Sequence, residues 1–173
     1  FTVRVGGQSA DTALTSLTLN GSPVADGDTV QLPPRSTSVN IVATPRDPAA
    51  TVKISGRTGL VVGNNTIQIV VTAADKVATR YIFITAVVAP LSSNTDLAEF
   101  TVNGTAVSDN GSLELAPLTR SVVVVAKPAD VEAVAVISGK TVVDGANKLT
   151  VAVTAANGTV RTYTVTLNVR VLS

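Results

Sequence analysis

Short segments with alternating apolar and polar residues run along the whole chain, separated by turns rich in Gly, Asn, Asp and Pro. Ile67, Ile69 and Val71 are spaced two apart, and the apolar residues of 163–169 follow the same period. A period of two predicts strands with one face buried and the other in water. Abundant Val, Ile and Thr favour the same structure because β-branched side chains fit a pleated sheet. The pattern therefore predicts an all-β protein.

Six or seven short strands are expected in each half of the chain, joined by tight turns. Asn-Gly pairs at 20–21, 103–104 and 157–158 are typical of type I′ hairpin turns. Regular spacing of short strands favours a sandwich or barrel. The expected strands are residues 13–19, 29–32, 38–44, 51–55, 66–73 and 79–87, then 96–102, 112–115, 121–127, 133–138, 148–155 and 160–169.

The two halves are copies of one module. Residues 17–21 match 100–104, residues 54–56 match 137–139 and, after one deleted residue, 71–74 match 153–156, with Tyr81 matched to Tyr163. This predicts an N-terminal strand and linker at 1–9, a first β-sandwich at 10–89 and a second at 90–173. The linker near Pro90 is short and stiffened by proline.

The copies differ in their closing strand. With Tyr81 matched to Tyr163, Ile82 and Ile84 occupy positions where the second copy has Thr164 and Thr166. These positions are expected to face outward, and an apolar outer face often marks a contact with another chain. Ile82 and Ile84 are therefore candidate interface residues, the alternative being that isoleucine simply forms good strands.

The composition argues against catalysis and metal binding by this chain. It has no His, Cys, Met or Trp, so the commonest general base, the commonest metal ligand and any thiol nucleophile are missing. The acidic residues are scattered at turns, and the Asp26-Gly27-Asp28 cluster is interpreted as a turn because calcium needs about six or more oxygen ligands. We expect no enzyme activity, no cofactor and no metal. Net charge is +1 with no basic run, so nucleic acid is not an expected partner. No apolar run reaches the roughly 18 residues of a membrane helix, so no membrane insertion is expected.

Three segments of the first copy resemble the bacterial cadherin-like β-sandwich domain. They are an Asp-Pro-Ala turn at 47–49, a Gly-Asn-Asn-Thr hairpin at 63–66 and a closing strand led by Tyr81. The second copy fits less well, with Asp130, residues 145–148 and Tyr163. The resemblance covers nearly the whole chain and implies immunoglobulin-like, antiparallel β-sandwiches in tandem. It implies repeated modules of bacterial surface and secreted proteins, with similar modules on phage virions, but its motifs specify architecture rather than activity.

Phe1, Val3 and Val5 form an alternating apolar segment ahead of the first copy and are also candidate interface residues. Three interpretations stay open. The segment is the closing strand of a preceding module, a strand donated to a neighbouring subunit, or an extra edge strand of its own chain.

The sequence therefore predicts a non-catalytic structural module of a bacterial extracellular surface or filamentous assembly. A phage virion protein, in a tail or decorating a capsid, is one alternative, and an adhesive or carbohydrate-binding module of a secreted protein is another. The expected partners are other copies of the chain or neighbouring modules of a larger assembly, at the cell surface or, in the alternative, in a virion.

Overall fold

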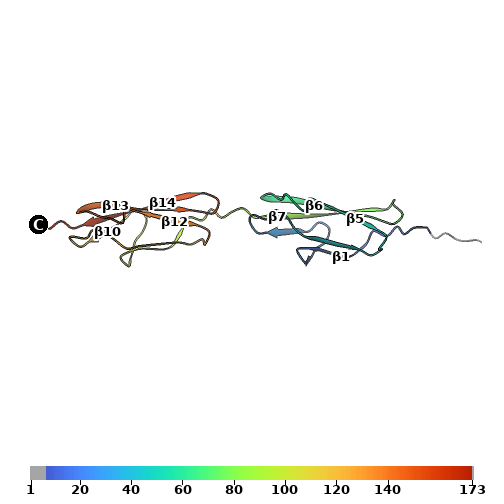
Figure 1. Ribbon diagram of the computed structural model, residues 1–173, viewed down its shortest axis with the longest axis horizontal. Coiled ribbons are helices and arrows are strands. Elements are labelled where there is room, and N and C mark those ends of the chain that lie inside the picture. Colours follow the sequence, from blue (N-terminus) through green and yellow to red (C-terminus); the bar gives the residue numbers. More distant parts are fainter. Residues whose placement is uncertain (1–6, 173) are drawn as a thin grey trace, which may run out of the picture. The chain divides into compact units, whose positions relative to one another are not determined.

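The computed structural model describes residues 7–172, which divide into two compact units between Pro90 and Leu91. We call them the first and second module. Each contains seven strands in two facing sheets, one of three strands and one of four. In the first module β6 and β7 lie in one layer and β1 in the other (Figure 1).

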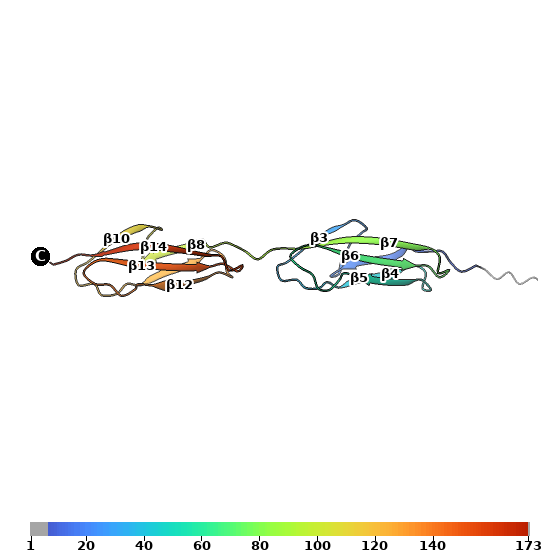
Figure 2. The same cartoon turned by 90° about the horizontal axis from the view of Figure 1, so that it is seen from above.

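The first module begins with the three-stranded sheet, in the order β2-β1-β4. Its strands are β1 (Leu14–Leu19), β2 (Ser22–Pro23) and β4 (Ile41–Pro45). The four-stranded sheet has the order β3-β7-β6-β5, which Figure 2 shows side by side. Its strands are β3 (Thr29–Leu32), β5 (Thr51–Ser55), β6 (Gly63–Thr72) and β7 (Thr79–Val88).

The second module repeats this plan with sheets in the orders β11-β8-β9 and β10-β14-β13-β12. The three-stranded sheet holds β8 (Leu97–Val102), β9 (Thr105–Ala106) and β11 (Val124–Pro128). The four-stranded sheet holds β10 (Gly111–Leu115), β12 (Val134–Ser138), β13 (Gly145–Thr154) and β14 (Val160–Val169).

The core of each module lies between its sheets, and β6 and β14 bury the faces that the alternation predicted. Ile67, Ile69 and Val71 of β6 are fully buried. In the second module Val165 and Leu167 of β14 are buried in the same way. No polar or charged residue among 7–172 is buried, so packing of aliphatic side chains holds each sandwich together.

The predicted all-β sandwich fold is confirmed, and one detail differs: the three-stranded sheets are antiparallel, whereas each four-stranded sheet contains one parallel pair. β3 runs parallel to the second half of β7, with Thr29 beside Thr85 and Leu32 beside Val88. β10 pairs in parallel with β14 in the same way. The short strands β2 and β9 were also absent from the expected set.

The turns follow the sequence in two places out of three. Asn20-Gly21 and Asn103-Gly104 have positive φ at both residues, as type I′ turns require. At Asn157-Gly158 only the glycine has positive φ (90°), so the type I′ prediction fails there. The Asn157 side chain instead accepts the Thr159 N–H (2.9 Å) and shapes a five-residue connection.

An asparagine bracket stabilises the start of β6 and of β13. Asn65 accepts the N–H of Val61 (2.9 Å) and donates from Nδ2 to the carbonyls of Val61 (2.7 Å), Gly63 (2.9 Å) and Ala86 (3.3 Å). Asn147 makes the equivalent four bonds in the second module. One side chain thus holds a loop against two strands.

Candidate interaction surfaces

The candidate interface residues of β7 lie in the core, which contradicts the prediction that they face outward. Ile82 is 2 % exposed and Ile84 is 0 % exposed, and both belong to the packed cluster of the first module. Ile82 pairs with Ile69, just as Tyr163 pairs with Val151 in the second module. The structural counterpart of Tyr163 is therefore Ile82 and not Tyr81.

A one-residue difference in turn length explains the error. The turn between β6 and β7 has six residues, 73–78, whereas that between β13 and β14 has five, 155–159. Matching Tyr81 to Tyr163 by residue type ignored this difference. Because side chains alternate between faces, a shift of one residue exchanges the buried and exposed positions of the whole strand.

The corrected register places two aromatic side chains on the outer face of β7. Tyr81 is 56 % exposed and Phe83 is 45 % exposed. Tyr81 lies opposite Val70 of β6. Since β7 and β14 are offset by 81 residues, the second module has Thr162 and Thr164 at these positions. The two copies therefore differ in the polarity of the outer face of the closing strand, as predicted. The apolar residues responsible are Tyr81 and Phe83 and not Ile82 and Ile84.

Phe1, Val3 and Val5, the other candidate interface residues, lie outside the described residues.

The first half of β7 also has an open edge. The Phe83 N–H donates to Asp26 Oδ1 (2.8 Å) and the Phe83 carbonyl accepts the Gly27 N–H (2.8 Å), on the side away from β6. Backbone groups of every second residue point to the same side of a strand. Those of Thr79 and Tyr81 therefore point to this edge, where no other described strand reaches them, because β3 begins only beside Thr85.

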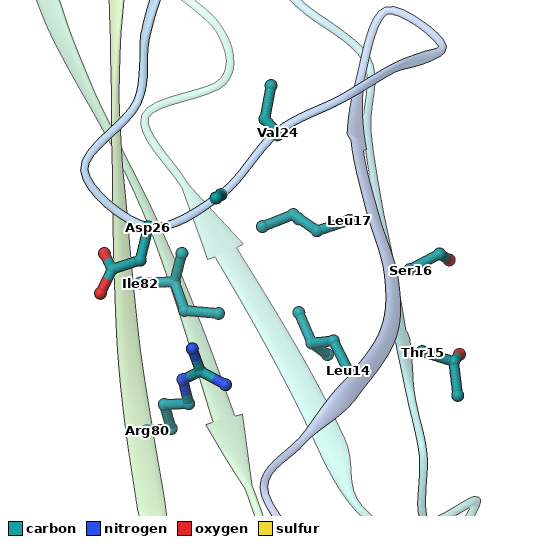
Figure 3. Close-up of a pocket in the computed structure, with 9 residues that line it drawn as sticks. Leu14, Thr15, Ser16, Leu17, Val24, Asp26, Arg80 and Ile82 are labelled. Carbon is teal, nitrogen blue, oxygen red and sulfur yellow. The ribbon is translucent and has the colours of Figure 1, made fainter.

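A groove of about 250 Å³ runs along the inner side of this edge, between β1 and β7. Leu14 and Leu17 form one wall, Ile82 forms the other, and Val24 closes one end (Figure 3). The Arg80 side chain lies next to Ile82 on the β7 side of the groove (Figure 3). None of the ion pairs formed within residues 7–172 involves Arg80.

The second module has a groove at the same position, about 480 Å³ in volume, and its lining side chains contact one another. Arg161, the counterpart of Arg80, forms ion pairs with Asp96 (3.1 Å) and Asp109 (3.5 Å). Its guanidinium also lies 4.4 Å from the centre of the Tyr163 ring, which meets Phe100 edge to face. The position of Asp96 is Ala13 in the first module, so that one of the two carboxylates is missing there.

The segments leading into the two modules, residues 9–13 and 92–96, share one hydrogen-bond pattern. The carbonyl of Ser9 accepts the Asp75 N–H (3.1 Å), and the carbonyl of Ser92 accepts the Asn157 N–H (3.0 Å). The Asp11 carboxylate then accepts the Ala13 N–H (2.8 Å), and in the second module the side-chain oxygen of Asn94 accepts the Asp96 N–H (2.9 Å). Each leading segment is thus attached to the turn before the closing strand.

Acidic side chains build turns in both modules. A hydrogen bond from Arg46 Nε (2.7 Å), then one from the Ala13 N–H, lowers the pKa of Asp11. The N–H groups of Val77 and Ala78 lower the pKa of Asp75.

Two predicted aspartate turns are confirmed. Asp47 accepts the Ala49 N–H (2.9 Å), and Asp130 accepts the Glu132 N–H (2.9 Å). A hydrogen bond from the Ser92 side chain and, to a smaller extent, one from the Glu132 N–H lower the pKa of Asp130. Asp28 accepts the Ala25 N–H (2.7 Å), which closes the turn predicted at residues 26–28.

Across residues 7–172 no three His, Cys, Asp or Glu side chains come together in a way that would hold a metal ion. The same range contains no helix, and hence none long and apolar enough to span a membrane.

No family model and no curated protein sequence matches the chain. Among solved structures it is similar to the titin domains Z1Z2 in complex with telethonin, at 10 % identity and a TM-score of 0.36, covering 93 % of this chain and 100 % of that one. It is also similar to human mucin-like protocadherin EC1-2 (10 % identity, TM-score 0.29, 88 % and 97 % covered). A third similarity is to fibronectin(III)-like modules of Clostridium thermocellum CbhA (16 % identity, TM-score 0.27, 89 % and 94 % covered).

These similarities are too distant to carry an argument about function. The fold follows from the chain itself, with seven strands in two facing sheets and the third strand parallel to the last, repeated once. Each half of the chain is thus a seven-stranded β-sandwich, and the two sandwiches stand in tandem along the sequence.

Proposed function

We propose that the chain is a non-catalytic structural segment of an extracellular bacterial surface or filament assembly, and that its first module makes the specific contacts. The second module serves as a matched scaffold without the contact surface. Resemblance of residues 47–49 and 63–66 to cadherin-like modules of bacterial surface proteins supports the setting.

The observation that carries the proposal is the difference between β7 and β14. Two modules with the same topology have opposite polarity at equivalent outward positions, with Tyr81 and Phe83 in one and Thr162 and Thr164 in the other. Aromatic side chains are enriched at protein interfaces because they bury a large area at low entropic cost. Neither ring is needed for the core, since both are about half exposed.

The test is site-specific photo-crosslinking in cells that make the protein. A photoreactive phenylalanine analogue replaces Phe83 in one variant and Thr164 in the other. We expect crosslinks from position 83 to one defined protein of the assembly, or to another copy of the chain, and none from position 164. Equal crosslinking at both positions, or none at either, contradicts the proposal.

Carbohydrate binding is a second candidate that the same surface favours, because exposed aromatic side chains such as Tyr81 and Phe83 can stack against sugar rings. Affinity electrophoresis in polysaccharide gels separates it from the first candidate. Retardation of the natural chain that disappears in Tyr81→Thr/Phe83→Thr, with no protein crosslinks from position 83, favours carbohydrate.

A further inference from the structure

We propose that the first half of β7 is a strand-addition site, which binds an extended segment of another polypeptide carrying an acidic residue flanked by apolar ones. This rests on the proposed function and names the chemistry of the partner at the same surface. The site comprises the open edge at Thr79 and Tyr81, the groove behind it, and the exposed rings in front.

The backbone supplies the first part of the argument. Thr79 and Tyr81 each present an N–H and a carbonyl at the edge, and no strand or loop among residues 7–172 bonds them. An unpaired edge is a template for another strand, and proteins usually protect it with a bulge, a proline or an inward charge. The pairing of β7 with β6 is regular over ten residues and β7 contains no proline, so of these devices only the inward charge of Arg80 is present. A strand added here must therefore match that charge.

The groove determines which residues the added strand carries. Side chains of that strand alternate between the outer face, beside Tyr81, and the inner side, above Leu14 and Leu17. The inner positions therefore suit apolar side chains. Asp26 limits the site at its far end, because its carboxylate already holds the Phe83 N–H.

The inner position opposite Arg80 is the exception, because there the charge of Arg80 determines which residue the added strand carries. A residue opposite Arg80 on an added strand points to the same side as Arg80, with the two Cβ atoms roughly 5 Å apart. Arg80 has no carboxylate within ion-pairing distance among the described residues, and the six residues before them contain no acid. An acidic residue at that position would pair with it. Arg161 in the second module is already held by Asp96 and Asp109, so the groove there lacks a free cation.

The experiment titrates the full chain with a defined probe and follows backbone amide shifts by NMR. The probe is an acetylated and amidated hexapeptide of alternating valine and threonine in which aspartate replaces the central valine. Its control has asparagine at that position. We expect the Thr79 and Tyr81 amides to shift at lower peptide concentration than the Thr162 amide, and the asparagine peptide to bind about three-fold more weakly.

Two variants test the two parts of the site separately. Arg80→Gln should weaken the aspartate peptide about three-fold and then abolish the difference between the two peptides. Tyr81→Pro removes an N–H that points to the open edge, which an edge strand tolerates, and should abolish binding. Arg161→Gln is the matched control and should change neither affinity. If Tyr81→Pro proves to be unfolded, Thr79→Pro removes the other outward N–H.

Several results overturn the inference. One is equal affinity for both peptides in the natural chain, and another is binding that persists in the folded proline variant. A third is shifts confined to the second module, or no shifts at millimolar peptide. If the peptide fails to bind while position 83 still crosslinks specifically, strand addition is wrong and the proposed structural role stands. If crosslinking fails as well, both are wrong.

Discussion

The register of β7 can be tested by placing threonine at two adjacent positions of the same strand. Ile84 is fully buried and Phe83 is 45 % exposed on the opposite face. Ile84→Thr removes two carbon atoms from the core, worth about 0.8 kcal/mol each, and buries a hydroxyl, which costs about 1–3 kcal/mol without a partner. The described core contains no buried polar residue that could bond this hydroxyl. The expected loss is therefore about 3 kcal/mol, against less than about 1 kcal/mol for Phe83→Thr, which places a β-branched residue that favours strands on the outer face.

Each module contains one tyrosine, which gives a simple assay. In a Tyr163→Phe background, fluorescence reports unfolding of the first module through Tyr81 alone. Urea titrations of the two threonine variants then give the free energy of unfolding of that module. If Ile84→Thr has less than about 0.5 kcal/mol effect while Phe83→Thr costs more than about 2 kcal/mol, Phe83 is the buried residue and the argument for an aromatic outer face collapses.

Three further predictions follow from the described contacts. Asn65→Ala should destabilise the first module by about 2 kcal/mol in urea titrations, because four hydrogen bonds of a half-buried amide are lost; an effect below about 0.5 kcal/mol contradicts this. Gly56→Ala should prevent stable folding of that module, since a Cβ on this positive-φ residue would collide with the Thr66 carbonyl oxygen, and native-like circular dichroism with an unchanged melting temperature would be the contrary result. The lowered pKa values of Asp11 and Asp75 stabilise the fold above their ordinary value of 3.8, and this contribution is lost as pH falls through the lower folded-state values. Unfolding titrations at pH 5 and pH 2.5 should therefore show a smaller loss of stability in Asp11→Asn/Asp75→Asn than in the natural chain.

Strand positions were predictable because they depend on local alternation. The expected strands at 29–32, 51–55 and 160–169 coincide with β3, β5 and β14. The burial of β6 was predictable for the same reason, since Ile67, Ile69 and Val71 lie on a single face.

Features that depend on distant partners were not predictable from local pattern. The four residues of β3 carry no mark of parallel pairing with β7, which lies over fifty residues later. The inversion of Ile82 and Tyr81 came from a single extra residue in the turn at 73–78. Both faces of β7 carry large apolar side chains, with Ile82 and Ile84 on one face and Tyr81 and Phe83 on the other. Residue type alone therefore could not identify which face is buried.

The open edge and the groove were missed for a related reason. Arg80 lacks an ion-pair partner that Arg161 has, because the first module has Ala13 at the position of Asp96. The duplication could have revealed this, because Arg80 and Arg161 become equivalent once the turn lengths are aligned. The fact that β3 pairs only with the second half of β7 had no counterpart in the sequence.

The attachment of the leading segment has a mechanical consequence. In each module the chain arrives beside the turn that precedes the closing strand, and it leaves from the opposite end of that strand. Tension between the two ends would therefore pull the closing strand along its own axis. Ladder hydrogen bonds lie perpendicular to the strands, so this direction shears the ten-residue pairing of β7 with β6 as a group instead of peeling it one bond at a time. The force that such a sandwich withstands is therefore set by the rate at which all the hydrogen bonds of the ladder break together.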